Sequence, residues 1–172
     1  MITYDLSNLR VLIVDDNDYM RRIIAMFLRS MGVRKIIEKE TAGQALSEVR
    51  RFVPDLLITD WMMRPVDGLD LVRQVRMDRD PSISHLPIIV LTGFTDLPRV
   101  YQARDAGVHE VLAKPISATI LYQRIISLIE HPKPFLRTTD YFGPDRHGGQ
   151  TIVAEKPTSP EVDEAVEDVI EI

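Results

Sequence analysis

Five polar side chains directly follow or close apolar segments, and their chemical types together would suit a divalent cation and a phosphoryl group. Asp15 and Asp16 follow one apolar run, Asp60 closes another, Thr92 follows a third and Lys114 a fourth. Three converging carboxylates would repel one another, and at least one pKa would rise. A hard divalent cation such as Mg²⁺ accepts oxygen ligands of this kind and keeps several waters. The ammonium of Lys114 and the hydroxyl of Thr92 would stand opposite and suit a phosphoryl group.

These side chains meet only if the apolar segments form one parallel sheet. The predicted strands are Val11–Val14, Ile36–Ile37, Leu56–Ile58, Pro87–Leu91 and Val108–Leu112. Most of them are continuous apolar runs, which is typical of parallel strands that are covered on both faces.

Between the predicted strands, apolar residues recur at helical spacing. The predicted helices cover about 17–31, 42–53, a segment from about 68, 97–106 and 117–130. Asp16 or Asn17 can cap the first helix, and Gly32 and Gly107 follow the first and fourth. Five β–α units predict an open, doubly wound α/β sheet, whose ligand site lies at the carboxyl ends of the strands. The polar residues therefore belong to one edge of the sheet.

The order and spacing of these motifs resemble the response-regulator receiver domain of bacterial two-component signalling. The resemblance covers roughly residues 8–130. It rests on Val11-Leu-Ile-Val-Asp-Asp-Asn17, Leu56-Leu-Ile-Thr-Asp60 with Asp67-Gly68, Val90-Leu-Thr-Gly93 and Lys114-Pro115. The resemblance implies a flavodoxin-like (βα)₅ fold with strand order 2-1-3-4-5.

The resemblance also implies a role for each acidic residue. Asp60 would be the phospho-acceptor, attacking a phosphohistidine on a sensor histidine kinase or a histidine phosphotransfer protein. Asp15 and Asp16 would hold Mg²⁺ together with Asp60 and the backbone carbonyl of Met62. The chemistry is nucleophilic transfer to a carboxylate, to which the protein contributes position and charge neutralisation.

The remaining two site residues would act on the transferred group. By the same resemblance, Lys114 would pair with the phosphoryl oxygens, and Thr92 would hydrogen-bond to the group and move toward it. The Lys114–Pro115 bond is expected to be cis, the usual proline exception. Such a protein is not an enzyme with a separate substrate, because it catalyses only its own phosphorylation and dephosphorylation. Its output is expected through contacts with a downstream protein.

Several positions depart from the family pattern. Val111 stands where the family commonly has an aromatic switch residue, so the usual readout is in doubt. Tyr101 is interpreted as either a substitute switch or an ordinary surface residue of an amphipathic helix. Pro65 comes one place later than usual in the loop after the acceptor. Met62 and Phe94, which would flank the phosphoryl group, are both apolar and cannot orient an attacking water. We therefore expect slow autodephosphorylation, although both side chains could simply pack locally.

The charge and composition of the chain exclude some classes of binding partner. The chain of 172 residues carries 21 basic and 26 acidic side chains, and residues 132–172 hold its entire net charge of −5. The preceding residues carry no net charge and therefore imply no basic face, which argues against nucleic-acid binding. The sequence contains no cysteine, no apolar run long enough for a bilayer and no signal-peptide pattern, so we expect a cytoplasmic protein that does not bind membranes. Exposed helix faces could support a homodimer.

The predicted organisation is a receiver domain over 1–131 and an acidic extension over 132–172. Phe135, Tyr141 and Phe142 are expected to lie on the receiver or in a solvated tail. Residues 159–171 have the spacing and capping residues of a short amphipathic helix, which would be marginal alone. The four histidines show no metal-ligand spacing and are interpreted as surface residues: His85, His109, His131 and His147.

Two alternatives stay open at this point. A pseudo-receiver would use the same fold as an interaction module without phosphorylation, which Val111 favours. A haloacid-dehalogenase-type phosphatase would use Asp16-Asn-Asp18 as its motif, with Thr92 and Lys114 in supporting roles. That class needs a further acidic pair after the lysine strand, which this sequence lacks, and it leaves Asp60 without a function.

Overall fold

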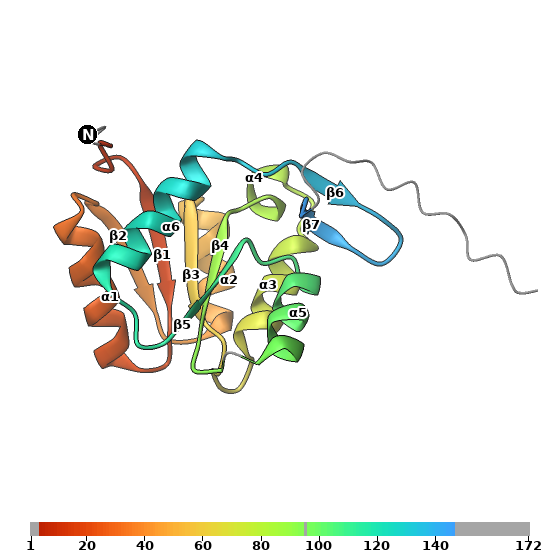
Figure 1. The fold of residues 1–172 in the computed structure, drawn as a ribbon, viewed down its shortest axis with the longest axis horizontal. Helices are drawn as coiled ribbons and strands as arrows, with labels where there is room; N and C mark the ends of the chain where they lie inside the picture. Colours follow the sequence, from red (N-terminus) through yellow and green to blue (C-terminus); the bar gives the residue numbers. More distant parts are fainter. Residues whose placement is uncertain (1–3, 95, 147–172) are drawn as a thin grey trace, which may run out of the picture.

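A computed structural model describes residues 4–94 and 96–146 of the chain, and its centre is a five-stranded parallel sheet (Figure 1). The strand order is β2-β1-β3-β4-β5, which confirms the expected doubly wound topology. The strands are β1 (Arg10–Val14), β2 (Lys35–Lys39), β3 (Leu56–Asp60), β4 (Ile88–Thr92) and β5 (Glu110–Ala113).

Helices connect the strands, and each begins at a polar residue whose side chain accepts hydrogen bonds from the first turn. They are α1 (Asp18–Ser30), α2 (Ala42–Phe52), α3 (Gly68–Arg76), α4 (Pro81–Ser84), α5 (Leu97–Asp105) and α6 (Ala118–Glu130). The capping residues are Asn17, Thr41, Asp67, Asp80, Asp96 and Ser117. All five expected helices are present. Within the described ranges, none of these helices combines the length and apolar character that crossing a membrane requires.

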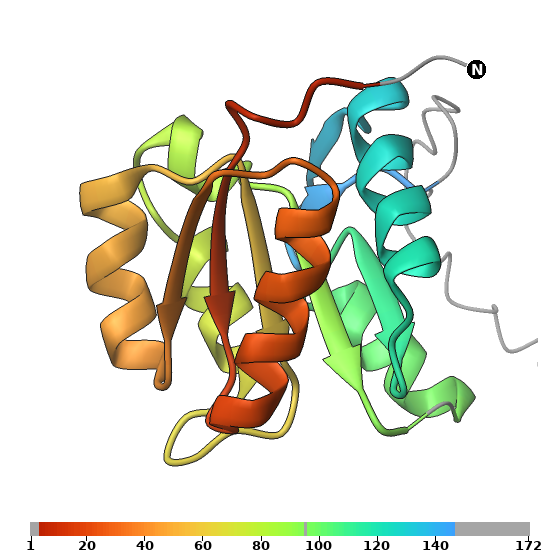
Figure 2. The same ribbon diagram turned by 90° about the vertical axis from the view of Figure 1, so that its left-hand side faces the viewer.

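The helices cover the two faces of the sheet and create two apolar cores. Helices α1 and α6 lie on one face, and α2, α3 and α5 lie on the other (Figure 2). Side chains of each strand alternate between them, so that Val11 and Ile13 of β1 join the first core and Leu12 and Val14 the second. This double coverage explains why the strands read as continuous apolar runs.

The sequence prediction differs from the structure at the fifth strand and at α4. The fifth strand begins at Glu110 rather than Val108, because the amide of Val108 still donates to the carbonyl of Ala103 in the turn that ends α5. Helix α4 was not predicted, since four residues are too few to show a periodic pattern. The Asp80-Pro81 pair is its only local signal, as a cap followed by a first-turn proline.

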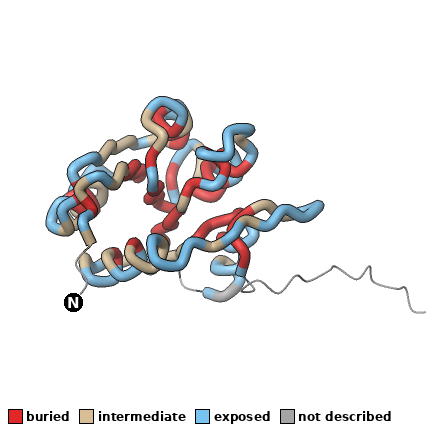
Figure 3. The backbone as a smooth tube through the Cα atoms, turned by 90° about the horizontal axis from the view of Figure 1, so that it is seen from above, coloured by how far each residue is buried: buried red, intermediate tan, exposed pale blue. Residues whose placement is uncertain are grey.

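The first part of the C-terminal extension forms an antiparallel hairpin that packs on the receiver body. Its strands are β6 (Phe135–Arg137) and β7 (Phe142–Pro144). The ring centroid of Phe135 lies 4.4 Å from that of His85 and 5.5 Å from that of His109. The hairpin base is therefore docked near α4, while its tip projects into solvent (Figures 1 and 3). The predicted helix over 159–171 lies outside the described residues.

Beneath the hairpin, His109 is buried, which corrects its interpretation as a surface residue. The residue is 4% exposed, and its Nδ1 accepts from the Ile88 amide at 3.2 Å and lies 3.3 Å from Nη2 of Arg76. Arg76 is 5% exposed and donates to the carbonyls of Gly107 and Ser84 at 2.9 and 3.0 Å. Burial lowers the pKa of His109 to about 3 and that of Arg76 to about 9.

The other three histidines differ in their positions. His85 and His131 are exposed, as expected, and His147 lies outside the described residues. No sequence pattern distinguishes His109 from them, because one of its contacts is with Phe135, in a hairpin that begins 26 positions later in the chain.

Candidate functional site

The structure brings the three acidic residues together at the carboxyl edge of the sheet. Asp60 is the last residue of β3 and Asp15 directly follows β1, and these two strands are parallel neighbours. Carboxylate oxygens of Asp15, Asp16 and Asp60 lie within 4.8 Å of one another. Asp15 and Asp60 are buried, at 0% and 6% exposure, whereas Asp16 faces solvent. A cation arriving from solvent would thus meet one open ligand and two enclosed ones.

Asp15 is held at several points, and one of its carboxylate oxygens has no hydrogen bond in the described part of the chain. Its amide donates to the Lys39 carbonyl at 3.2 Å, and its Oδ1 accepts from the Asn17 amide at 2.8 Å. Its Oδ2 is buried without a hydrogen bond in the described part of the chain. Burial raises the pKa of Asp15, the Asn17 amide opposes that rise, and the negative charge of Asp60 adds to it.

The Oδ2 atom of Asp15 and the acidic donor set fit a hard divalent cation. Buried polar atoms nearly always have a hydrogen-bond partner, whereas this Oδ2 has none in the described part of the chain and only a 3.6 Å ion pair with Lys114. Beside two further carboxylates, it could therefore accept a second positive partner. Carboxylate oxygens with a solvent-facing side match the ligand preference of Mg²⁺, which retains several waters. Asp15, Asp16 and Asp60 could hold such an ion.

Lys114 supplies the fixed positive charge of the cluster. Its Nζ lies 2.8 Å from Oδ1 of Asp60 and 3.6 Å from Oδ2 of Asp15. Its amide donates to the carbonyl of Thr92 at 2.7 Å, which ties the ends of β4 and β5 together. The Lys114–Pro115 peptide bond is cis, as expected.

Thr92 ends β4 with its side chain buried at 2% exposure. Its Oγ1 accepts a hydrogen bond from the Phe94 amide at 3.0 Å, so the hydroxyl proton remains available for donation. Phe94 is 39% exposed, and the Cζ atom of Arg99 lies 3.5 Å from its ring centroid. A hydrogen bond therefore joins the loop that follows Thr92 directly to the Thr92 hydroxyl group.

The loop after Asp60 returns so closely to the strand that one position must be glycine. A Cβ atom at Gly68 would lie 2.0 Å from the backbone oxygen of Asp60, and the Gly68 amide donates to the Trp61 carbonyl at 2.8 Å. Trp61 is buried, whereas Met62 is 60% exposed. The metal-binding role of the Met62 carbonyl stays a prediction.

The two residues considered for signal output occupy different surroundings. Val111 is half-buried on β5 and packs against the core cluster on the α2, α3 and α5 face. Tyr101 is 51% exposed on α5, with the Cζ atom of Arg104 4.9 Å from its ring centroid. Tyr101 therefore lies on the surface in this structure, with its ring beside Arg104.

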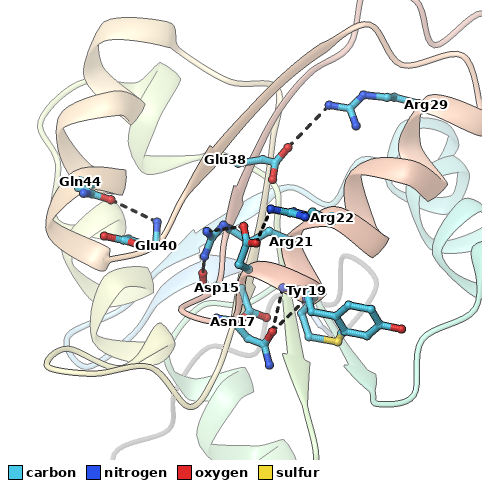
Figure 4. Close-up of polar contacts among 11 residues, drawn as sticks. Asp15, Asn17, Tyr19, Arg21, Arg22, Arg29, Glu38, Glu40 and Gln44 are labelled. Atoms are coloured by element: carbon cyan, nitrogen blue, oxygen red, sulfur yellow. Dashed lines mark hydrogen bonds and ion pairs between the residues drawn. The ribbon is translucent and has the colours of Figure 1, made fainter.

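Sequence reasoning missed Arg21, whose guanidinium group lies beside the acidic loop (Figure 4). Its Nη1 donates to the backbone carbonyl of Asp15 at 2.7 Å, and its Nη2 pairs with Oδ1 of Asp18 at 3.0 Å. The only signal was the three-residue spacing from Asp18 to Arg21, which is common on helix surfaces.

The chemistry available here is attack by a carboxylate on an electrophile that carries negative charge. Asp60 is the carboxylate closest to the ammonium group, and Thr92 offers a hydroxyl donor at the next strand end. A cation in the acidic cluster and the ammonium of Lys114 would neutralise charge on opposite sides of a phosphoryl group. Only the edge where β1, β3, β4 and β5 end gathers these groups in the described ranges.

Comparison with known proteins agrees with this arrangement. Residues 11–126 match the family model described as the response regulator receiver domain. The chain is 35% identical over 122 residues to the chemotaxis protein CheY of Pseudomonas aeruginosa, a match covering 71% of this chain and 97% of that protein. It is 32% identical over 124 residues to chemotaxis protein CheY-3 of Vibrio cholerae, covering 72% and 94%.

Solved structures show the same likeness. The chemotaxis response regulator CheY4 of Vibrio cholerae superposes with a TM-score of 0.63 at 26% identity, covering 70% of this chain and 98% of that one. The signal receiver domain of a signal transduction histidine kinase from Syntrophus aciditrophicus shares the fold, with a TM-score of 0.64 at 24% identity, covering 76% and 96%. The chain belongs to the response-regulator receiver family.

Proposed function

We propose that Asp60 accepts a phosphoryl group from a phosphohistidine of a sensor histidine kinase or a histidine phosphotransfer protein. The reaction is Mg²⁺-dependent, takes place in the cytoplasm, and changes how the chain contacts a downstream protein. The observation that carries the proposal is the 2.8 Å ion pair between Lys114 and Asp60 within a cluster of three carboxylates. Membership of the receiver family supports the assignment of the donor.

The transfer exchanges one bond to phosphorus for another. A carboxylate oxygen of Asp60 attacks phosphorus, the phosphorus–nitrogen bond breaks, and the imidazole leaves with the electron pair, giving an acyl phosphate. The Lys114 ammonium stabilises the negative charge that develops on the phosphoryl oxygens, and the Thr92 hydroxyl donates a hydrogen bond to one of them. Mg²⁺ bound by Asp15, Asp16, Asp60 and the Met62 carbonyl would supply further positive charge to the same oxygens.

Phosphorylation by a small phosphodonor tests the proposal without the cognate kinase. The full chain is incubated with acetyl phosphate and Mg²⁺ and analysed on a phosphate-affinity gel. We expect one shifted band that disappears in Asp60→Ala and after chelation of Mg²⁺. Asp70→Ala is the matched control, because it removes an exposed carboxylate from α3 that pairs only with Arg73 among the described contacts. An unshifted wild-type band would contradict the proposal.

A pseudo-receiver is the second candidate, and the half-buried Val111 in place of an aromatic switch is the observation that favours it. Its signature would be an absent band shift together with absent beryllofluoride binding. A phosphatase of the haloacid-dehalogenase type fits less well, because the Asp18 carboxylate pairs with Arg21 and Arg22 rather than joining the acidic cluster.

A further inference from the structure

Arg21 lies near the start of α1, and its side chain turns back toward the loop that carries Asp15 and Asp16. Only 13% of the side chain is exposed, whereas the next residue, Arg22, is 76% exposed. Both arginines pair with the Asp18 carboxylate, at 3.0 and 2.8 Å. Arg21 alone also donates to the carbonyl of Asp15, at 2.7 Å. The two neighbours therefore carry the same charge and share a partner but differ in contact with the site (Figure 4).

The carbonyl that Arg21 binds belongs to the peptide group joining Asp15 to Asp16. Orienting this peptide group orients both residues, because it fixes the backbone on the carboxyl side of one and on the amino side of the other. Asp15 also contacts the Lys39 carbonyl, the Asn17 amide and the Lys114 ammonium. None of these groups binds the peptide oxygen, which is left to Arg21 in the described contacts. Arg21 thus completes the restraint of the two carboxylates.

We propose that Arg21 is a positioning residue that holds the Asp15–Asp16 peptide in the orientation required for divalent-cation binding. The inference rests on the proposed function, since it assigns a cation to the cluster. Groups that orient metal ligands from outside the coordination sphere commonly change metal affinity by about 10- to 100-fold when removed. Arg21 acts through Asp15 and Asp16 and does not touch the cation.

Electrostatics alone predicts the opposite sign. Arg21 is a cation beside an acidic cluster, so its removal would strengthen binding of a second cation if charge were its only contribution. The positioning role predicts weaker binding. The direction of the change in Mg²⁺ affinity therefore separates the two explanations.

The surroundings of Arg21 allow the substitution to be made without opening the core. Arg21 borders a polar groove of about 350 Å³ together with Glu38, Lys39, Glu40 and Gln44. Arg21 is not among the described residues of the two apolar clusters, so we expect its truncation to leave them intact. Any loss of Mg²⁺ affinity then reflects a change in the orientation of the loop that carries Asp15 and Asp16.

The test is Mg²⁺ titration of the full chain, followed by the fluorescence of Trp61. This is the only tryptophan of the sequence, and it is buried directly after Asp60. We expect Arg21→Ala to weaken Mg²⁺ binding by about 10-fold. Arg21→Lys should recover part of the loss, because an ammonium group reaches one acceptor but lacks the fork that bridges two. Arg22→Ala should stay within about twofold of wild type.

Thermal melting without Mg²⁺ separates the loop from the fold as a whole. Arg21→Ala should melt close to Arg22→Ala; if it does not fold, Arg21→Lys is compared directly with Arg22→Lys. Unchanged or tighter Mg²⁺ binding by the Arg21 variant, or an equal loss in both variants, would overturn the inference while leaving the proposed function standing. A wild-type chain that fails to bind Mg²⁺ would overturn both.

Discussion

The Nζ atom of Lys114 lies 2.8 Å from Oδ1 of Asp60, although the two residues are 54 positions apart in the sequence. Their strands, β5 and β3, are not neighbours, since β4 lies between them. The ammonium group therefore reaches across the end of β4 to the Asp60 carboxylate. This relationship links the acidic half of the site to the half that would receive the phosphoryl oxygens.

Removing this ammonium should slow phosphorylation without removing the metal site. We expect Lys114→Ala to lower the rate of phosphorylation by acetyl phosphate on the order of 100-fold, because a fixed charge aimed at the phosphoryl oxygens is lost. Mg²⁺ affinity should be unchanged or higher, since a cation beside Asp60 and Asp15 has gone. Lys133→Ala is the control, because it removes a similarly half-buried lysine that pairs with Glu110. Equal rates in wild type and Lys114→Ala would refute this role.

The acyl phosphate should persist longer in the wild type than in variants with polar flanking residues. By the family resemblance, Met62 and Phe94 would flank the phosphoryl group with a thioether and an aromatic ring. The Cζ atom of Arg99 lies 3.5 Å from the Phe94 ring centroid. Neither side chain can orient water for attack on phosphorus. We expect shorter half-lives for Met62→Asn and Phe94→Glu, measured from loss of the shifted gel band after donor removal. A wild-type half-life below those of the variants would show that the apolar pair offers no protection.

Burial of neutral His109 should make the protein lose stability as the pH falls. The folded-state pKa is about 3, against about 6.5 for an unfolded histidine, so between these values only the unfolded chain binds the proton. The free energy of unfolding then falls with decreasing pH from about 6.5 toward 3, with a limiting slope of about 1.4 kcal/mol per pH unit from this group. The contribution of His109 to the free energy of unfolding is fully present above about pH 6.5.

Urea unfolding at a series of pH values measures this slope. His109→Asn keeps a hydrogen-bond acceptor and removes the titrating ring, so its pH dependence between 6.5 and 4 should be flatter than that of the wild type. His131→Asn, at an exposed position, should leave the wild-type slope. The same slope in all three proteins would be inconsistent with burial of His109.

Substitutions at two glycines test whether the hairpin packs on the receiver body. Gly107 and Gly32 have nearly the same left-handed backbone, with φ of +91° and +92°. A Cβ atom at Gly107 would lie 2.8 Å from the Phe142 carbonyl, whereas one at Gly32 would meet nothing within 4 Å. Gly32→Ala should cost about 1 kcal/mol through its left-handed backbone alone. Gly107→Ala should cost at least about 1 kcal/mol more, because the hairpin must shift. Equal costs in denaturant unfolding would mean that the hairpin does not pack there.

The five-stranded fold could be predicted because each β–α unit carries its own local signals. Val11–Val14 reads as a covered strand, Asn17 as a cap and Gly32 as a helix end, and all three are present as expected. The convergence of Asp15, Asp60 and Lys114 follows once parallel strands are assumed, because strand ends of such a sheet share an edge.

What could not be predicted depends on contacts between distant segments. The buried His109 has the Phe135 ring centroid 5.5 Å from its own, and Arg21 donates to the backbone carbonyl of Asp15. Neither contact leaves a periodic pattern or a charge motif in the sequence. The β6–β7 hairpin itself consists of two three-residue strands, too short to show alternation.

Reductive trapping tests the central claim most directly, because it locates the acyl phosphate on one residue. The full chain is phosphorylated with acetyl phosphate and Mg²⁺ and then reduced with borohydride, which converts an aspartyl phosphate to homoserine. Mass spectrometry of the peptides should place homoserine at position 60 and leave Asp15, Asp16 and Asp67 as aspartate. Homoserine at any other aspartate, with position 60 unmodified, would contradict the account.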